Sequence, residues 1–320
     1  MNIVCATDDN FVQHCSIMLT SLLVNNSDVH IYVLTEGLKL ENEKIIRDEV
    51  EDKGGNVDFY IVDSSIVEKF PMPQCVGLHH ISRATYYRLL ISDLLPKSID
   101  KVIYLDCDII VNKSIQELWN TDLTGYALAA VKQIGFGYEA ERLGYPIEYG
   151  YFNAGVNMIN LAYFRSHNVT DNLIKYIAEN YSQIKYHDQD TLNAVLYNKT
   201  LHIMPQWNMT SIIYAYKLQK RGDSINGSVL NDYKAEKENA FKTMKEPYVI
   251  HFVSRPKPWQ DNCVHPLYYL YYYYAKHTLH FANIRPQKEW KRQIAILKHA
   301  LRERISAIKQ LFMHTDRSRI

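Results

Sequence analysis

The chain has 320 residues, 47% of them hydrophobic and 22% charged, and this ordinary globular composition allows one large α/β domain or two smaller ones. No apolar run reaches the roughly 18 residues of a membrane-spanning helix, so we expect no such span. The net charge of +1 conceals an asymmetry. From Arg285 onward, 10 Lys and Arg against 3 Asp and Glu give +7, and the 26 against 32 that precede them give −6.

The chain begins directly with an apolar strand pattern, from which we expect no signal peptide. Its cysteines are odd in number and widely spaced, and none has the spacing of zinc ligands. We therefore expect reduced thiols and a cytoplasmic protein. The cysteines are Cys5, Cys15, Cys75, Cys107 and Cys263.

Short β-rich runs alternate with helical patterns, which predicts βαβ units and a largely parallel sheet with helices on both faces. Strands are expected at Asn2–Thr7, Val29–Leu34, Val57–Val62, Lys101–Leu105, Ala127–Val131, Phe152–Ile159, Leu201–Met204 and Tyr248–Phe252. Helices are expected at Phe11–Val24, Glu41–Asp52, Ser82–Leu94, Leu161–Tyr181 and Asp188–Tyr197. Sheets of this kind bind ligands at the carboxyl ends of their strands.

Acidic residues follow two of these strands, at Asp8 and at Asp106-Cys107-Asp108. Acids are depleted from strands, so the second cluster needs a reason. Side chains at positions i and i+2 share a face, and where the strand ends both carboxylates can reach one hard cation such as Mg²⁺ or Mn²⁺. A turn in which one Asp caps a helix near Ser114 also fits. Phosphatases of the haloacid dehalogenase type carry Asp-x-Asp too, but near their first strand.

His251 follows the strand-like run Tyr248–Ile250 and opens a segment that ends in Lys257-Pro-Trp259. Neutral imidazole readily completes a Mn²⁺ site with carboxylates. Lys257 would supply positive charge to a phosphate leaving group. The plainer alternatives are that His251 is a hydrogen-bonded core residue and that Trp259 is a packing anchor.

Two more segments have small or polar residues at positions that a ligand would approach. Phe152–Val156 opens a strand with polar and small residues, although a strand glycine such as Gly155 also marks bulges. His187-Asp188-Gln189-Asp190 opens a helix, where an Asp either caps the helix or hydrogen-bonds sugar hydroxyls.

Taken in order, these segments resemble the retaining glycosyltransferases of family 8, which include bacterial lipopolysaccharide galactosyl- and glucosyltransferases and glycogenin. The resemblance implies an α/β fold of GT-A type, with a Rossmann-like, mostly parallel sheet flanked by helices, over residues 1–280. It extends from Ile3 to Trp259, about four-fifths of the chain. The matching stretches are 6–10, 83–89, 102–108, 152–156, 187–190 and 251–259.

The resemblance also implies a ligand set. Mn²⁺ or Mg²⁺ would be bound by Asp106, Asp108 and His251, and the donor would be UDP-glucose or UDP-galactose. Ser254 departs from the family's pattern, which has a glycine there that permits positive φ near the phosphates. Catalytic roles are implied for Gln189, Asp188 and Lys257. Donor contacts are implied for Ala6, Asp8, Asn10, Arg88, Asp106, Cys107, Asp108, Asn153, Ala154, Asp188, Gln189, Ser254 and Lys257.

The implied reaction moves a hexose, with retention, to a hydroxyl of a glycan or lipid-linked saccharide. Retention requires a covalent intermediate or attack on the face from which the leaving group departs, and the poor nucleophilicity of Gln189 favours same-face attack. A metal-dependent nucleotidyltransferase or phosphatase would leave the segment from His251 to Trp259 unexplained. A binding protein without catalysis is disfavoured because all the predicted metal ligands are present.

The tail, residues 281–320, carries apolar residues at every third or fourth position, which predicts an amphipathic helix. This helix either packs on the catalytic domain or lies on an anionic bilayer, with the Tyr268–Tyr274 segment at the same interface. The charge asymmetry and the family's lipid-linked acceptors favour peripheral attachment to the inner face of the cytoplasmic membrane, and nucleic acid is not an expected partner. The apolar residues are Trp290, Ile294, Leu297, Leu301, Ile305, Ile308 and Phe312, and the basic ones are Lys291, Arg292, Lys298, Arg302, Arg304 and Lys309.

Overall fold

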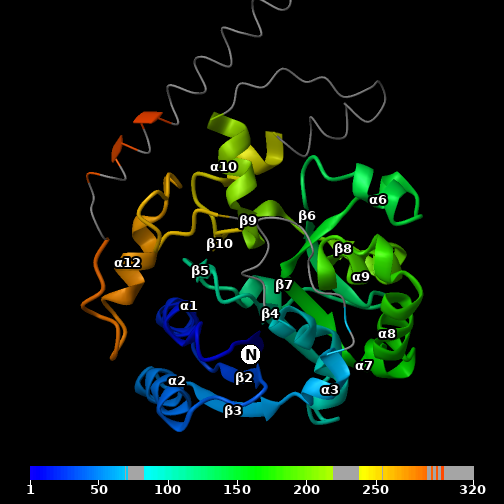
Figure 1. Ribbon diagram of the computed structural model, residues 1–320, viewed down its shortest axis with the longest axis horizontal. Coiled ribbons are helices and arrows are strands. Elements are labelled where there is room, and N and C mark those ends of the chain that lie inside the picture. Colours follow the sequence, from blue (N-terminus) through cyan, green and yellow to red (C-terminus); the bar gives the residue numbers. More distant parts are fainter. Residues whose placement is uncertain are drawn as a thin grey trace, which may run out of the picture.

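The computed structural model describes residues 1–68, 70, 83–218, 238–253 and 255–286, together with 290, 293, 294, 297 and 298. A seven-stranded sheet lies at its centre (Figure 1). Its strands are β1 (Asn2–Ala6), β2 (His30–Thr35), β3 (Asn56–Ile61), β4 (Lys101–Leu105), β6 (Leu128–Lys132), β7 (Phe152–Asn160) and β8 (Thr200–His202). They lie in the order β3-β2-β1-β4-β7-β6-β8, and only β7 runs antiparallel to its neighbours.

Alternate side chains of these strands enter two separate cores. Ile3 and Cys5 face α1 (Val12–Asn25) and α2 (Leu40–Asp52), whereas Val4 faces the opposite layer. Both faces are therefore apolar, as is typical of a parallel sheet with helices on each side. The opposite layer contains the 3₁₀ turn η1 (Arg83–Leu90) and the helices α4 (Ile91–Leu94), α7 (Leu161–Ser166), α8 (Val169–Glu179) and α9 (His187–Leu196).

A second sheet of three strands lies beside the first. It consists of β5 (Ile109–Val111), β10 (Val249–His251) and β9 (Met209–Thr210), with β10 antiparallel to β5 and parallel to β9. Only Asp106-Cys107-Asp108 separates β4 from β5. The acidic cluster is therefore the crossing between the two sheets, and its carboxylates converge through a turn rather than through the alternation of a strand.

The helix expected over Leu161–Tyr181 is two helices. The chain breaks after Ser166, and Asn168 has a left-handed φ of 50° before α8 begins. The side chain of Asn160 caps α7 by accepting a bond from the Tyr163 N–H at 2.9 Å. The segment expected as a helix from Ser82 starts as the 3₁₀ turn η1 and becomes α-helical at α4, and Ser82 itself lies outside the described residues.

The tyrosine-rich segment forms α12 (Tyr269–Ala275), which packs beside α1 (Figure 1). Tyr271, Tyr272 and Tyr274 are buried there, so for these three the expected membrane-interface position is wrong. Their rings pack in one apolar cluster with Ile17 of α1, whereas Tyr269 and Tyr273 are half exposed.

The remaining elements are short. Within the described ranges no helix is both long and apolar enough to cross a bilayer. The described cysteines Cys5, Cys15, Cys107 and Cys263 are free thiols. Further helices are α3 (Ser64–Val67), α5 (Gln116–Trp119), α6 (Tyr138–Arg142) and α10 (Ser211–Leu218), residues 238–243 are helical as well, and the 3₁₀ turns are η2 (Ile147–Tyr149), η3 (Tyr181–Gln183), η4 (Tyr197–Lys199) and η5 (Pro205–Trp207).

Candidate active site

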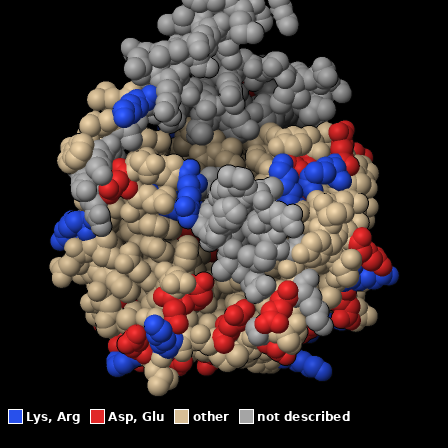
Figure 2. Space-filling view, in the orientation of Figure 1, with Lys and Arg blue, Asp and Glu red and all other residues tan. Residues whose placement is uncertain are grey.

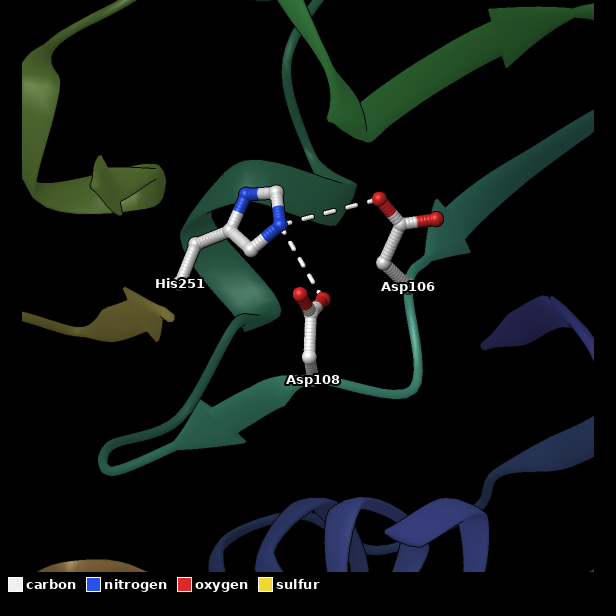
Figure 3. A group of neighbouring side chains, drawn as sticks. All are labelled: Asp106, Asp108 and His251. Atoms are coloured by element: carbon white, nitrogen blue, oxygen red, sulfur yellow. Dashed lines mark ion pairs between the residues drawn. The ribbon is translucent and has the colours of Figure 1, made fainter. Parts of the chain in front are cut away.

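Three side chains converge where the two sheets meet. Asp106 follows β4, Asp108 precedes β5, and the pairing of β10 with β5 brings His251 beside them. His251 Nε2 lies 3.1 Å from Asp108 Oδ1 and 3.6 Å from Asp106 Oδ2 (Figure 3). One ligand atom from each residue lies within 4.8 Å of the others. The fold thus brings together the three residues that the sequence suggested as metal ligands.

The surroundings of this cluster fit a divalent cation. Two carboxylates and an imidazole are a donor set that suits Mn²⁺. Gly155 of β7 provides the space, because a Cβ there would lie 2.1 Å from His251 Cε1 and 2.7 Å from Asp106 Oδ2. Any larger residue would displace the two proposed ligands, so this strand glycine serves the cluster, and it also lies in the stretch of β7 where the register with β6 shifts.

Lys257 contacts the cluster through Asp108. Its Nζ donates to Asp108 Oδ2 at 2.5 Å and to the Phe252 carbonyl at 2.6 Å. Burial disfavours the charged form of Asp108, but Lys257 and His251 overcome that effect and hold its pKa well below the usual value. Asp108 is therefore ionised at neutral pH, as a metal ligand must be.

Arg88 connects the metal cluster to the helix that carries Asp188. Its Nη2 donates to Asp106 Oδ1 at 2.7 Å, its Nε lies 2.9 Å from Asp188 Oδ2, and its guanidinium carbon lies 4.2 Å from the Tyr104 ring centroid. The guanidinium is buried, so these charge pairs are shielded from water. Burial nevertheless outweighs Arg88 and raises the pKa of Asp188 to about 6.

Gln189 faces the cavity with its carbonyl oxygen engaged. Gln189 Oε1 accepts hydrogen bonds from Asn153 Nδ2 at 2.9 Å and from the Ala154 N–H at 3.1 Å. The amide nitrogen is the donor side of Gln189, and it donates to Gln133 Oε1 at 3.4 Å.

Asp190 points away from these groups. It is fully buried, and Oδ1 accepts from Arg142 Nη2 at 2.8 Å and from the Tyr151 hydroxyl at 2.7 Å. Oδ2 accepts from the N–H groups of Lys185 and Tyr186, which precede α9. Asp190 therefore stabilises the approach to the helix and takes no part in the cavity.

A cavity of about 520 Å³ joins these residues. Asn10 is exposed and does not line it, although the Asn10 N–H donates to Asp8 Oδ1 at 2.9 Å, and Ser254 lies outside the described residues. Sequence-predicted residues that line the cavity are Ala6, Asp8, Arg88, Asp106, Cys107, Asp108, Asn153, Ala154, Asp188, Gln189, His251 and Lys257.

Sequence reasoning missed several residues of this site. Thr85 donates to Asp188 and lies in the stretch from Arg83 to Leu89, so its position was visible although its role was not. Asn208 bonds to both His251 and Asn153, and no local pattern marks it. Gln133, Phe136, Tyr186, Ile212 and Arg255 also line the cavity.

A mostly parallel sheet with a second small sheet, and a carboxylate–histidine cluster where they meet, are the arrangement of a protein with a GT-A fold. The sequence of residues 2–263 matches the family described as Glycosyl transferase family 8, and the chain belongs to that family. This membership favours a glycosyltransferase over the nucleotidyltransferase and phosphatase alternatives.

Individual relatives are similar over most of the chain. General stress protein A of Bacillus subtilis is 32% identical over 284 residues, which is 87% of this chain and 94% of that protein. Lipopolysaccharide 1,3-galactosyltransferase of Salmonella typhimurium is 26% identical over 83% of this chain and 75% of its own length. The crystal structure of galactosyltransferase LgtC with donor and acceptor sugar analogues has a TM-score of 0.76 at 25% identity, covering 91% of this chain and all of LgtC.

Proposed function

We propose that this glycosyltransferase transfers glucose or galactose from a UDP-sugar to a hydroxyl of a glycan or lipid-linked saccharide, with Mn²⁺ and with retention at the anomeric carbon. The observation that carries the proposal is the convergence of Asp106, Asp108 and His251 in one cavity with Asp188 and Gln189. The cavity therefore combines a cation site with polar groups that suit sugar hydroxyls. The named activities of lipopolysaccharide galactosyltransferase and LgtC agree with a hexose donor.

The residues divide into a diphosphate side and a sugar side. Asp106, Asp108 and His251 would hold the cation, which when bound supplies positive charge to the diphosphate leaving group. Lys257 adjoins Asp108 and would add a second positive charge to the same group as the glycosidic bond breaks. Asp8 lines the same cavity beyond β1, where the uridine would lie.

On the sugar side, Gln189 acts as a hydrogen-bond donor rather than as a nucleophile. Its carbonyl oxygen already accepts two N–H groups, and attack by that oxygen would cost both bonds. Asp188 is held by Arg88 and Thr85 and would accept from a hydroxyl of the donor sugar. We therefore propose that the acceptor oxygen attacks on the face from which UDP departs.

The direct test is UDP release. Purified protein is incubated with UDP-glucose or UDP-galactose, with and without Mn²⁺, and UDP is quantified by a coupled assay. We expect metal-dependent release with one of the two donors in preference to the other. Absence of release with either donor, in the presence of Mn²⁺ and candidate saccharide acceptors, would contradict the proposed donor class.

Stereochemistry provides a separate test. With a UDP-α-sugar, we expect an α-linked product, which the anomeric proton coupling in the NMR spectrum of the new linkage identifies. A β-linked product would mean that the same-face mechanism is wrong, whatever the metal dependence.

A further inference from the structure

Each nitrogen of the His251 ring faces a different partner. Nε2 points between Asp106 and Asp108, and Figure 3 shows the other nitrogen pointing away from both carboxylates. That nitrogen, Nδ1, lies 3.0 Å from Oδ1 of Asn208. Asn208 is fully buried and immediately precedes β9, which pairs with the β10 strand that carries His251. The contact is therefore fixed by the register of two paired strands.

Two backbone N–H groups fix the orientation of the three side-chain amides that follow His251 in this series of contacts. The Gly155 N–H donates to Asn153 Oδ1 at 3.0 Å, so that atom is the amide oxygen. Asn208 Nδ2 lies 2.8 Å from the same oxygen and must donate to it, which leaves Oδ1 of Asn208 toward the histidine. Since this oxygen can only accept, Nδ1 of His251 must carry the proton, and Nε2 presents its lone pair to the carboxylates when the ring is neutral.

The same reasoning extends to the sugar side. Asn153 Nδ2 donates to Gln189 Oε1, which also accepts the Ala154 N–H and is thereby identified as oxygen. One directional series of hydrogen bonds therefore runs from His251 through Asn208 and Asn153 to Gln189. It connects the proposed metal ligand to the amide that faces the donor sugar.

We propose that Asn208 is a positioning residue that fixes the tautomer of His251 for metal binding and couples the metal site to Asn153 and Gln189. The inference rests on the proposed function, since it assigns Asn208 a role toward the proposed cation and donor. Partners of this kind fix the ring orientation of metal-binding histidines, and their loss typically costs roughly 10- to 100-fold in metal affinity. Nothing in the local sequence around Asn208 indicates this role.

Two substitutions at position 208 distinguish the contact with His251 from the contact with Asn153. Asn208→Ala removes both, and we expect Mn²⁺ affinity, measured by EPR titration without any donor, to fall roughly 10- to 100-fold. Asn208→Asp keeps an oxygen for the His251 Nδ1–H but replaces the donor to Asn153 with a second acceptor. We expect this variant to bind Mn²⁺ within about threefold of the wild type, while the turnover number for hexose transfer falls by roughly tenfold or more because Asn153 and Gln189 lose their orientation.

Asn160→Ala is the matched control. It also removes an asparagine hydrogen bond, the cap of α7, at the opposite end of β7 from the site. We expect it to lower the unfolding temperature without changing Mn²⁺ affinity or turnover. If Asn208→Ala does not fold, Asn208→Asp alone carries the test, since its side chain has the same size.

The outcomes are distinct from those that test the proposed function. If the wild type binds no Mn²⁺, the proposed metal site fails. If the wild type binds Mn²⁺ and the folded Asn208→Ala variant binds it equally well, the role of Asn208 toward His251 is wrong. Loss of Mn²⁺ affinity in Asn208→Asp would overturn that role too, and wild-type turnover in Asn208→Asp would overturn the coupling to Asn153.

Discussion

Two of the site's carboxylates share one guanidinium. Arg88 holds Asp106 through Nη2 and Asp188 through Nε. Because the guanidinium is buried, the charge of each carboxylate strongly affects the other. Asp108 instead pairs with Lys257. The two proposed metal-binding aspartates are thus held by different basic side chains. A single substitution of either basic residue would therefore perturb the orientation of one aspartate without removing the partner of the other.

The first prediction concerns the aspartates themselves. Asp106→Asn or Asp108→Asn should lower turnover on the order of 100-fold or more, since each removes a charged ligand at the leaving group. Folding should change little, because both side chains lie at the cavity rather than in the apolar cores. Initial rates with Mn²⁺ and circular dichroism measure the two effects. Asp122→Asn, an exposed turn substitution, is the control that should retain activity.

Chelation tests the same assignment without mutation. EDTA should abolish UDP release by the wild type, and added Mn²⁺ should restore it. Full activity in EDTA would show that the cluster of Asp106, Asp108 and His251 does not hold a catalytic cation.

The second prediction follows from the raised pKa of Asp188. Because that pKa is about 6, against an ordinary 3.8, kcat/KM should fall as the pH drops below 6 and Asp188 loses the charge that pairs with Arg88. Stability should respond in the opposite direction. The folded state binds this proton more tightly than the unfolded state, so the contribution of Asp188 to stability is greatest below 3.8 and is lost as the pH rises through 6.

The acid limb of the rate profile therefore should not come from unfolding at this residue. Parallel measurement of rates and circular dichroism from about pH 5 to 8 separates the two effects. Asp188→Asn should be slow at every pH and lack the inflection. A flat wild-type profile across that range would contradict the assignment.

At the scale of elements, a buried acid helps to attach the segment after α12 to the body. Glu49 of α2 is fully buried and accepts from the Thr20 hydroxyl of α1 at 2.8 Å, from Lys53 Nζ at 2.8 Å and from the Leu279 N–H at 2.9 Å. Phe281 and Ile284 also pack against the apolar cores. The chain thus remains part of the folded body as far as Ile284.

The third prediction tests this attachment. Glu49→Ala leaves the Thr20 hydroxyl and the Leu279 N–H without their acceptor and removes one of the two carboxylates that pair with Lys53, and we expect a loss of about 3 kcal/mol in the free energy of unfolding. Glu43→Ala, which removes an exposed pair with Arg47, should cost about 0.5 kcal/mol or less. Urea unfolding measures both. Equal effects of the two substitutions would mean that Glu49 does not anchor the segment.

The local sequence pattern was sufficient to predict features that depend on a single strand or helix. The strand β4 is an apolar run with a clear end, and the prediction of a mostly parallel sheet is confirmed. The acids after β4 and the histidine at the end of β10 could be connected because strand ends carry ligands in such sheets. The break at Asn168 was missed because neither glycine nor proline marks it, and asparagine adopts the left-handed conformation.

Other features depend on contacts between distant segments. The need for glycine at position 155 arises only because β10 brings His251 against β7. Asn208 becomes relevant only once β9 and β10 are paired. The alternation of side chains could not explain Asp106 and Asp108, because the chain leaves one sheet and enters another between them.

At the scale of the whole molecule, charge is distributed unevenly along the chain. Acidic side chains gather on the lower part of the face in Figure 2, around α2 and β3. The chain from Arg285 onward carries 10 Lys and Arg against 3 Asp and Glu. Trp290, Ile294 and Leu297 are helical and 61%, 41% and 68% exposed, whereas the rest of the expected stripe, Leu301, Ile305, Ile308 and Phe312, lies outside the described residues.

The last prediction is that this tail attaches the enzyme to an anionic membrane surface. An exposed apolar stripe flanked by basic residues can insert into the headgroup region, where each Lys or Arg adds on the order of 1 kcal/mol. The full chain should co-sediment with vesicles that contain anionic lipid, less so as salt rises, and poorly with neutral vesicles. A chain that ends at Arg285 keeps the packing of Phe281 and Ile284, so it should stay folded and release UDP while losing vesicle binding. Leu297→Glu in the full chain should weaken binding in the same assay. If the shortened chain sediments with vesicles as well as the intact one, attachment lies elsewhere, and if it unfolds, the tail belongs to the core.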